Sequence, residues 1–359
     1  MSERDDNEAG TSIPFLLARP SRPSLAPARP RNTNVPEPPP VAKVTTVTQG
    51  WTAPLGLLVI GLLVLVSVFA DLLSSDLPIV CKVHDSVYVL PCITRPPPVV
   101  DAKFRAPLPG EWAVAALVAH GPGPSDAALR GPWAVPTHPL GTDTEGRDMF
   151  AVVVHGTRSY LGFALLSVLA VVLLGASMGA VAGYFRGAFD DLLSRVVESL
   201  SAFPPLVLII GIQAAVDRPS VLTLFLAIGL TRWPEFARLV RAEVLFASTQ
   251  DYVTAARALG AAPLRILVRH VAPNVGGVIA VTAALSIGGV ILTEAAVDFL
   301  GLGAQAGSAS WGQAMGQFRT APDAWWLLFF PGLMLFALVL GHNVVGERLR
   351  RAFDPRATD

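Results

Sequence analysis

The chain has 359 residues, of which 52% are hydrophobic and only 15% are charged, and its mean hydropathy is +0.53. This composition is too apolar for an ordinary soluble domain and predicts an integral membrane protein. Because its 27 basic and 27 acidic residues cancel, no overall field favours nucleic acid or an acidic partner.

The N-terminal segment, residues 1–50, is rich in proline, arginine and small polar residues. Such a segment cannot bury a core, so we expect a disordered cytoplasmic tail. The first apolar run begins only after Trp51, and no small-residue cleavage site follows it. We therefore expect this run to stay in the protein as a membrane span rather than to be removed as a signal peptide.

Six segments have the apolarity of spanning helices, which need about 20 residues to cross a hydrocarbon core about 30 Å thick. These segments are residues 51–72, 160–184, 196–216, 220–231, 275–300 and 325–345. Pro204 and Pro205 predict a kink in the third. The fourth is expected to tilt or end early, because Arg232 and Glu235 follow it and are placed to form a pair on one helical turn. The predicted fold class is all-α, with six transmembrane helices.

Six spans place both termini on the same side of the membrane. Arginines of the tail, of the segments after the second and fourth spans, and of the C-terminus all fall on that side, which the positive-inside rule assigns to the cytoplasm. The predicted organisation is listed along the chain: a cytoplasmic tail (1–50), the first span (51–72), an extracytoplasmic loop (73–158), a core of five helices (159–346) and a cytoplasmic C-terminus (347–359).

Two cysteines, Cys81 and Cys92, lie in the predicted extracytoplasmic loop. The residues between them alternate apolar and polar side chains in the manner of a small hairpin. A local disulfide would require an oxidising, non-cytoplasmic compartment, and two free cysteines are equally compatible with the sequence.

The cytoplasmic segment between the fourth and fifth spans, residues 251–274, predicts two short helices. Ser248 or Thr249 is placed to cap the first helix, and Gly260 to end it in a left-handed turn. Pro263 suits the first position of the second helix, and Pro273 is expected to stop that helix before the membrane.

Small residues around this turn leave backbone exposed for the close approach of a partner. They are Ala255, Ala256, Ala258, Gly260, Ala261 and Ala262. Arg257, Arg265 and Arg269 are placed to reach acidic groups on that partner. From the residues alone, an alanine-rich surface hairpin with no partner explains the segment equally well. DNA binding is disfavoured because membrane spans hold both ends of the helix pair.

This segment resembles the cytoplasmic EAA loop of the permease subunits of ABC importers for dipeptides, oligopeptides and nickel. Ala255, Ala256, Gly260 and Pro273 match the spacing of that loop, whereas Thr254 replaces its leading glutamate. His270 and Ala272 replace an isoleucine and a leucine near its end. The resemblance extends over about 137–351, because residues 138–148, 156–160, 293–303 and 310–312 are similar to stretches of the second permease of peptide importers.

The resemblance implies a type I ABC importer permease in the bacterial cytoplasmic (inner) membrane, with a coupling loop at 248–274. The implied partners are two ABC ATPase subunits or a homodimer of one, a second permease, an extracytoplasmic substrate-binding protein and the lipid bilayer, but no nucleic acid. The coupling residues carried over are Thr254, Ala255, Ala256, Arg257, Ala258, Gly260, Pro263, Arg265, Arg269, His270 and Pro273. We expect no catalytic residues and no cofactor.

The sequence contains no phosphate-binding G-x-x-x-x-G-K-[S/T] loop, no G-x-S-x-G and no H-E-x-x-H, so ATP would be hydrolysed by another chain. Asp143, Glu145 and Asp148 superficially suggest a calcium loop, but the full ligand spacing is missing, and a turn that enters a helix is favoured; no metal site is predicted. Glu294 is expected to cap or pack within the bundle. Alternatives are an importer of nickel or another small solute, or a stand-alone membrane channel or enzyme.

Overall fold

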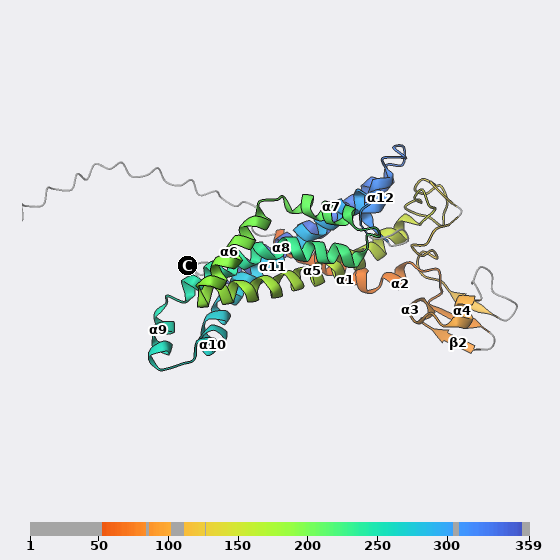
Figure 1. The fold of residues 1–359 in the computed structure, drawn as a ribbon. Coiled ribbons are helices and arrows are strands. Elements are labelled where there is room, and N and C mark those ends of the chain that lie inside the picture. Colours follow the sequence, from red (N-terminus) through yellow and green to blue (C-terminus); the bar gives the residue numbers. More distant parts are fainter. Residues whose placement is uncertain (1–51, 84–85, 102–110, 126, 304–308, 354–359) are drawn as a thin grey trace, which may run out of the picture. The chain divides into compact units, whose positions relative to one another are not determined.

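The computed structural model describes residues 52–83, 86–101, 111–125, 127–303 and 309–353, most of which are helical. Figure 1 shows long helices side by side, with shorter elements at their ends. The long helices are α1 (Thr52–Val68), α5 (Met149–Phe185), α6 (Ala188–Ser201), α7 (Pro205–Ala215), α8 (Val221–Ala247), α11 (Ala272–Phe299) and α13 (Trp326–Phe353). The shorter elements are α2 (Ala70–Leu73), β1 (Val80–Val83), β2 (Ser86–Val89), α3 (Pro91–Thr94), α4 (Pro97–Asp101), β3 (Trp112–Val114), α9 (Asp251–Ala258), α10 (Pro263–Ile266), the π-helix η1 (Leu267–Val271) and α12 (Trp311–Gln317).

α5 packs along α8, and small residues allow their backbones to approach. Gly175, Gly179 and Gly183 recur every four residues in the sequence, a spacing that places them in a stripe on one face of α5, and all three are buried. A Cβ atom added at Gly175 would lie 2.6 Å from the Cβ of Phe236 and 2.7 Å from the carbonyl oxygen of Trp233. Glycine at this position therefore sets the distance between the two helices.

The helix that contains the predicted fourth span does not end with its apolar part: α8 continues past Thr231 to Ala247, with Pro234 inside it, whereas the point at which the span leaves the membrane stays a prediction. Packing explains why the helix passes the proline. Trp233, Pro234, Phe236 and Ala237 are all buried, and neighbours that pack this closely hold a helix whose backbone ladder lacks one donor.

The predicted pair of Arg232 with Glu235 is wrong. The Arg232 guanidinium donates from Nη2 to Thr293 Oγ1 of α11 at 2.8 Å, and Glu235 is exposed. Arg232 therefore joins α8 to α11 instead of pairing along its own helix.

The kink predicted in the third span is a full break in the structure. α6 and α7 are bent by 81° at the residues between Ser201 and Pro205. Pro204 has extended backbone, with φ −59° and ψ 126°, and Pro205 takes the first helical position of α7. A proline that precedes another proline is driven out of the helical region, so the pair separates the helices rather than bending one.

The number of predicted spans is only partly supported. Three helical runs among the described residues are long and apolar enough to cross a membrane: Met149–Phe185, Pro263–Phe299 and Trp326–Phe353. Counting the bent pair α6 and α7 as one span gives four, and Pro54–Val68 of α1 is apolar but shorter. These helices support a multi-pass membrane protein, whereas the count of six stays a prediction.

The helix α5 begins at Met149, well before Tyr160, where the sequence predicts the start of the second span. Asp148 caps it, because its Oδ1 accepts a hydrogen bond from the Ala151 N–H at 2.9 Å. The residues before Asp148 form the expected turn into a helix, in which Asp143 accepts from the Arg147 Nε at 2.7 Å. The carboxylate of Asp143 is thus paired with the guanidinium group of Arg147 in the same turn.

The predicted hairpin around the cysteines is confirmed. β1 pairs antiparallel with β2, with Cys81 opposite Tyr88, and β3 pairs with the other edge of β1. Both cysteines are buried and free, so the structure has two thiols in place of the disulfide considered above. Burial raises the pKa of Cys81 and of Cys92, which keeps these thiols protonated and unreactive at neutral pH.

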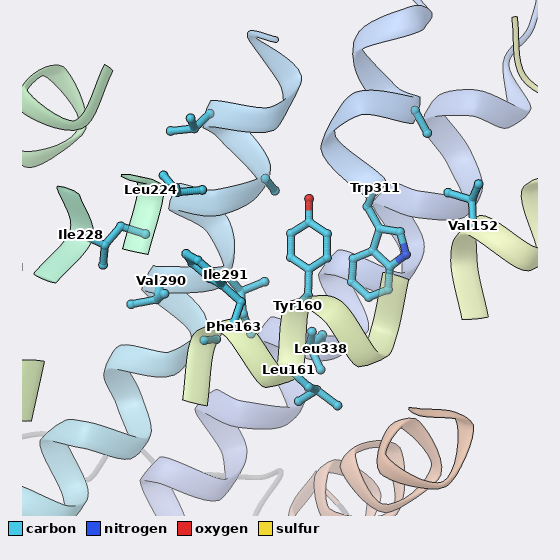
Figure 2. Close-up of a cluster of buried hydrophobic side chains, with 14 of the residues drawn as sticks. Val152, Tyr160, Leu161, Phe163, Leu224, Ile228, Val290, Ile291, Trp311 and Leu338 are labelled. Atoms are coloured by element: carbon cyan, nitrogen blue, oxygen red, sulfur yellow. The ribbon is translucent and has the colours of Figure 1, made fainter. Parts of the chain in front are cut away.

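The main core lies where α5, α8, α11, α12 and α13 meet (Figure 2). Tyr160 of α5 stacks on Trp311 of α12, with their ring centroids 4.8 Å apart. Both rings are almost completely buried, and Trp311 donates from Nε1 to the carbonyl of Val153 at 3.2 Å. This contact ties the segment after α11 back to the first long helix of the core.

We expect Gly175→Ala to destabilise the protein by about 1–3 kcal/mol, because the added methyl group must push α8 away from α5. The matched control is Gly162→Ala on the same helix, where an added Cβ meets nothing within 4 Å. There, the higher helix propensity of alanine should leave stability unchanged or raise it by up to about 1 kcal/mol. Thermal unfolding of the two purified variants in detergent distinguishes them, and equal melting temperatures would refute the close-packing argument.

Candidate functional site

The residues that follow α8 form a helix, a tight turn and a second helical segment, as the sequence predicts. α9 ends in a Schellman turn: the N–H of Gly260 bonds to Arg257 O at 2.9 Å, and the N–H of Ala261 bonds to Ala256 O at 3.1 Å. Gly260 has φ +77°, a left-handed conformation that favours glycine. Pro263 takes the first helical position of α10. We call residues 248–274 the coupling loop.

The predicted cap of α9 is wrong. Gln250 occupies the N-cap position without a side-chain hydrogen bond. Ser248 Oγ instead donates to Val244 O at 2.6 Å, and Thr249 Oγ1 donates to Phe246 O at 2.8 Å. Both hydroxyls therefore bond to carbonyl oxygens in the last turn of α8, and neither caps α9.

The prediction that Pro273 stops the second helix is also wrong, since helical backbone runs without a break from Pro263 to Phe299. The π-helix η1 explains this outcome. The N–H of Ala272 bonds to Leu267 O, five residues back, so the bonding pattern has already shifted when the chain reaches Pro273. The missing proline donor then costs little, and Asn274 Nδ2 donates to His270 O at 2.6 Å.

The inner face of the coupling loop is anchored on the ends of three long helices. Val253 and Ala256 of α9 are buried, together with residues of α10 and η1. This cluster packs against α8 and α11, and Tyr184 of α5 lies at its edge. The guanidinium carbon of Arg257 lies 5.7 Å from the centre of the Tyr184 ring, a cation–π contact. The loop is therefore a rigid extension of the bundle.

The outer face of the coupling loop carries most of the predicted residues. The exposed ones are Thr254, Ala255, Arg257, Ala258, Gly260, Pro263, Arg265, Arg269 and Pro273. His270 is half-buried, and Ala256 is buried against the bundle, so the side chain of Ala256 is not exposed on the outer face.

Three apolar residues on this face were missed by the sequence analysis: Leu259, Leu264 and Val268. Leu259 is 88% exposed at the tip of the turn, and Leu264 and Val268 are more than 60% exposed. The positions of Leu259 beside Gly260 and of Leu264 beside Pro263 were a usable signal, because leucines that flank a surface turn lack a core to enter. Large apolar side chains gathered on a surface tip are typical of a protein interface.

A second group of matched residues gathers at the opposite end of α11. Asp298 Oδ2 accepts hydrogen bonds from the hydroxyls of Tyr160, at 3.0 Å, and of Ser310. The N–H of Gly312 donates to the Tyr160 hydroxyl at 3.0 Å. Residues from three of the family-like stretches thus meet in one buried network around Asp298.

The stretch that resembles the entry to the second span also joins this end of the bundle. Gln317 of α12 donates from Nε2 to Asp143 Oδ2 at 3.2 Å, and its Oε1 accepts from the N–H of Thr144 at 3.1 Å. Trp326 Nε1 of α13 donates to Thr142 O at 3.0 Å. These hydrogen bonds connect the residues before α5 to α12 and to the start of α13.

A pair of histidines, His120 and His138, lies before α5, outside the helical bundle. The rings of His120 and His138 are 4.3 Å apart, and His138 Nδ1 lies 2.7 Å from Oδ2 of Asp148, the cap of α5. Burial, together with the neighbouring His138, lowers the pKa of His120, although Asp148 and Asp76 act in the opposite direction. His120 is therefore held in its neutral form.

A match to a family model covers the coupling loop, α11 and α13. The model describes the binding-protein-dependent transport system inner membrane component and matches residues 171–359, more than half of the 359-residue chain. The apolar helices and this match define a membrane transport permease, and the chain belongs to the family of inner membrane components of binding-protein-dependent transport systems.

The chain is similar to several curated relatives. It is 40% identical over 220 residues to a Brucella suis protein named as a peptide transport system permease, covering 61% of this chain and 74% of the relative. It is 38% identical over 229 residues to a dipeptide transport system permease of Alkalihalophilus pseudofirmus, covering 64% and 74%. The Bacillus subtilis oligopeptide transport system permease is 36% identical over 220 residues, covering 61% and 72%.

The chain is similar to a solved structure of the MetNI methionine ABC transporter in inward-facing conformations, and the alignment covers 57% of this chain and 98% of the MetNI chain. Its sequence identity is 18%, and its TM-score is 0.49.

We expect acidification to loosen the segment before α5 that contains His120. Below the ordinary histidine pKa of about 6.5, the unfolded segment takes up a proton that the folded segment resists, so the free energy of unfolding falls as the pH drops. Hydrogen exchange at Ile79 and Val118, corrected for intrinsic rates, should show less protection at pH 5.5 than at pH 7.5; their amides bond to Val114 O and Leu73 O.

The matched control for this prediction is His120→Gln, which keeps a polar side chain but cannot titrate. Its protection should depend less on pH than that of the wild type. An equal pH dependence in the two proteins would contradict the assignment to His120.

Proposed function

We propose that this chain is the membrane-spanning permease subunit of an ATP-driven ABC importer and forms part of the translocation path for peptides. The observation that carries the proposal is the coupling loop, which combines an exposed apolar tip with a base buried on α5, α8 and α11. The family match supports transport, and the names of the relatives support peptides as the cargo.

The coupling loop is suited to transmit force because both of its helical segments are attached to the bundle. Val253 and Ala256 anchor α9, and α10 continues through η1 into α11. When an ATPase subunit that holds the tip moves, the loop moves with the long helices instead of bending. A rigid element of this kind converts the closure of the ATPases into a change of helix tilt, which is the basis of alternating access.

The proposed assembly contains a second permease, two ABC ATPase subunits or a homodimer of one, and an extracytoplasmic substrate-binding protein. In this assembly the chain has six spans and both termini in the cytoplasm. The apolar tip at Leu259 and Leu264 enters a groove on the ATPase, and the exposed Arg265 and Arg269 face acidic groups at its rim.

Nickel or another small solute is the alternative cargo, and uptake distinguishes it from peptides. Liposomes that contain the complete importer and its binding protein are supplied with ATP and with either a labelled dipeptide or nickel. We expect ATP-dependent uptake of the dipeptide. Uptake of nickel without uptake of the dipeptide would show that nickel is the cargo, and the proposal of an ATP-driven importer would still hold.

The coupling role predicts where a cysteine cross-links to the ATPase. Because Ala258 is exposed on the outer face of α9, Ala258→Cys should cross-link to the ATPase subunit, with a yield that changes when ATP is added. The matched control is Ala256→Cys on the same helix, whose side chain is buried in the bundle and should not react. Both variants are made with Cys81 and Cys92 replaced by serine.

A purified complex that gives no cross-link at Ala258, or equal cross-links at both positions, would contradict the docking proposal. A second variant tests the apolar tip directly. Leu259→Asp should lower ATP-dependent uptake roughly tenfold or more, because a buried interface residue becomes a charge, while the permease itself remains folded.

A further inference from the structure

A cavity of about 620 Å³ opens between the outer ends of α8 and α11 and the neighbouring turns of α5. Its walls are largely apolar, with Phe163 and Leu166 on α5 and Leu222 and Phe225 on α8. One side carries two carboxylates, Glu294 and Asp298, which lie one helical turn apart on α11 and share its inner face. The volume is that of a site for a small organic ligand.

The two carboxylates differ in how they are satisfied. Asp298 is held by the hydroxyls of Tyr160 and Ser310. Glu294 is 8% exposed, yet among the described residues no donor reaches its Oε2. A buried carboxylate without a donor is costly, so a positively charged group in the cavity that Glu294 lines would stabilise it.

The chemistry of the cavity selects the kind of partner. A protonated amine would form short, charge-assisted hydrogen bonds to Glu294, and an apolar group attached to that amine would contact Phe163 and Phe225. A calcium ion takes about six to eight oxygen ligands, whereas two carboxylates, one already bonded, and a few hydroxyls provide too few. The cavity therefore fits an organic cation with an apolar side chain.

We propose that Glu294 binds the N-terminal ammonium group of a peptide during its passage, with the first side chain of the peptide against Phe163 and Phe225. This inference rests on the proposed peptide transport function. It adds a binding residue in the path and a requirement that the N-terminus of the cargo be free. Asp298 holds the wall of the cavity in place through Tyr160 and Ser310.

The test measures peptide binding directly to the purified complex of both permeases and the ATPases, without the substrate-binding protein. Saturation-transfer NMR follows alanyl-phenylalanine and its N-acetyl form at millimolar concentrations. We expect only the free-amine peptide to bind the wild-type complex, and Glu294→Gln to weaken its binding roughly 10- to 100-fold. Glu198→Gln, a change at an exposed glutamate of α6, is the matched control and should leave binding unchanged.

Each other outcome overturns the proposal. Equal binding of the two peptides by the wild type, no binding at all, or unchanged binding by Glu294→Gln would exclude an ammonium site. Loss of the second permease on purification of Glu294→Gln would assign Glu294 to a contact between subunits instead. Uptake by wild-type liposomes is measured in parallel, so a failure of peptide transport is distinguished from a failure of this site.

Discussion

The feature on which the rest of the molecule depends is the unbroken helical run from Pro263 to Phe299. Its 37 residues extend about 55 Å, with the coupling loop at one end and the carboxylates Glu294 and Asp298 at the other. Pro273 lies inside this run and lacks the backbone donor of an α-helix. The π-helix η1 accommodates the proline, so both ends belong to one continuous helical rod.

Two kinds of contact hold this rod in the bundle. On the side of the coupling loop, burial of Val253 and Ala256 fixes α9 against the rod, and the glycine stripe of α5 lets α8 come close enough to complete that cluster. At the other end, Tyr160 connects α5 to Asp298 and Trp311. On the proposed function, a movement imposed on the loop would be shared by α5, α8 and α11 and would reach the cavity between them.

Residues with local conformational rules were predictable from the sequence. Gly260 required a left-handed turn, and Pro263 suited the start of a helix. The glycines of α5 marked a close helix contact. The prediction for Pro273 failed because the structure compensates for its lost donor: the π turn before it has already shifted the backbone bonding pattern, so the helix continues. The exposure of single side chains was equally unpredictable. Ala256 and Ala258 are the same residue type in the same short helix, but the bundle buries only Ala256. The cavity required residues of three helices to be placed together, and no single segment contains that information.

The exposed leucines of the coupling loop also bear on the fate of the subunit before assembly. On the proposed function, a subunit made without its ATPase leaves Leu259 and Leu264 uncovered. Chaperones and proteases triage incompletely folded proteins in cells, so their steady-state abundance depends on more than their synthesis. The surface proposed to dock on the ATPase would then also limit the amount of orphan subunit, which would match the amount of permease to the amount of ATPase.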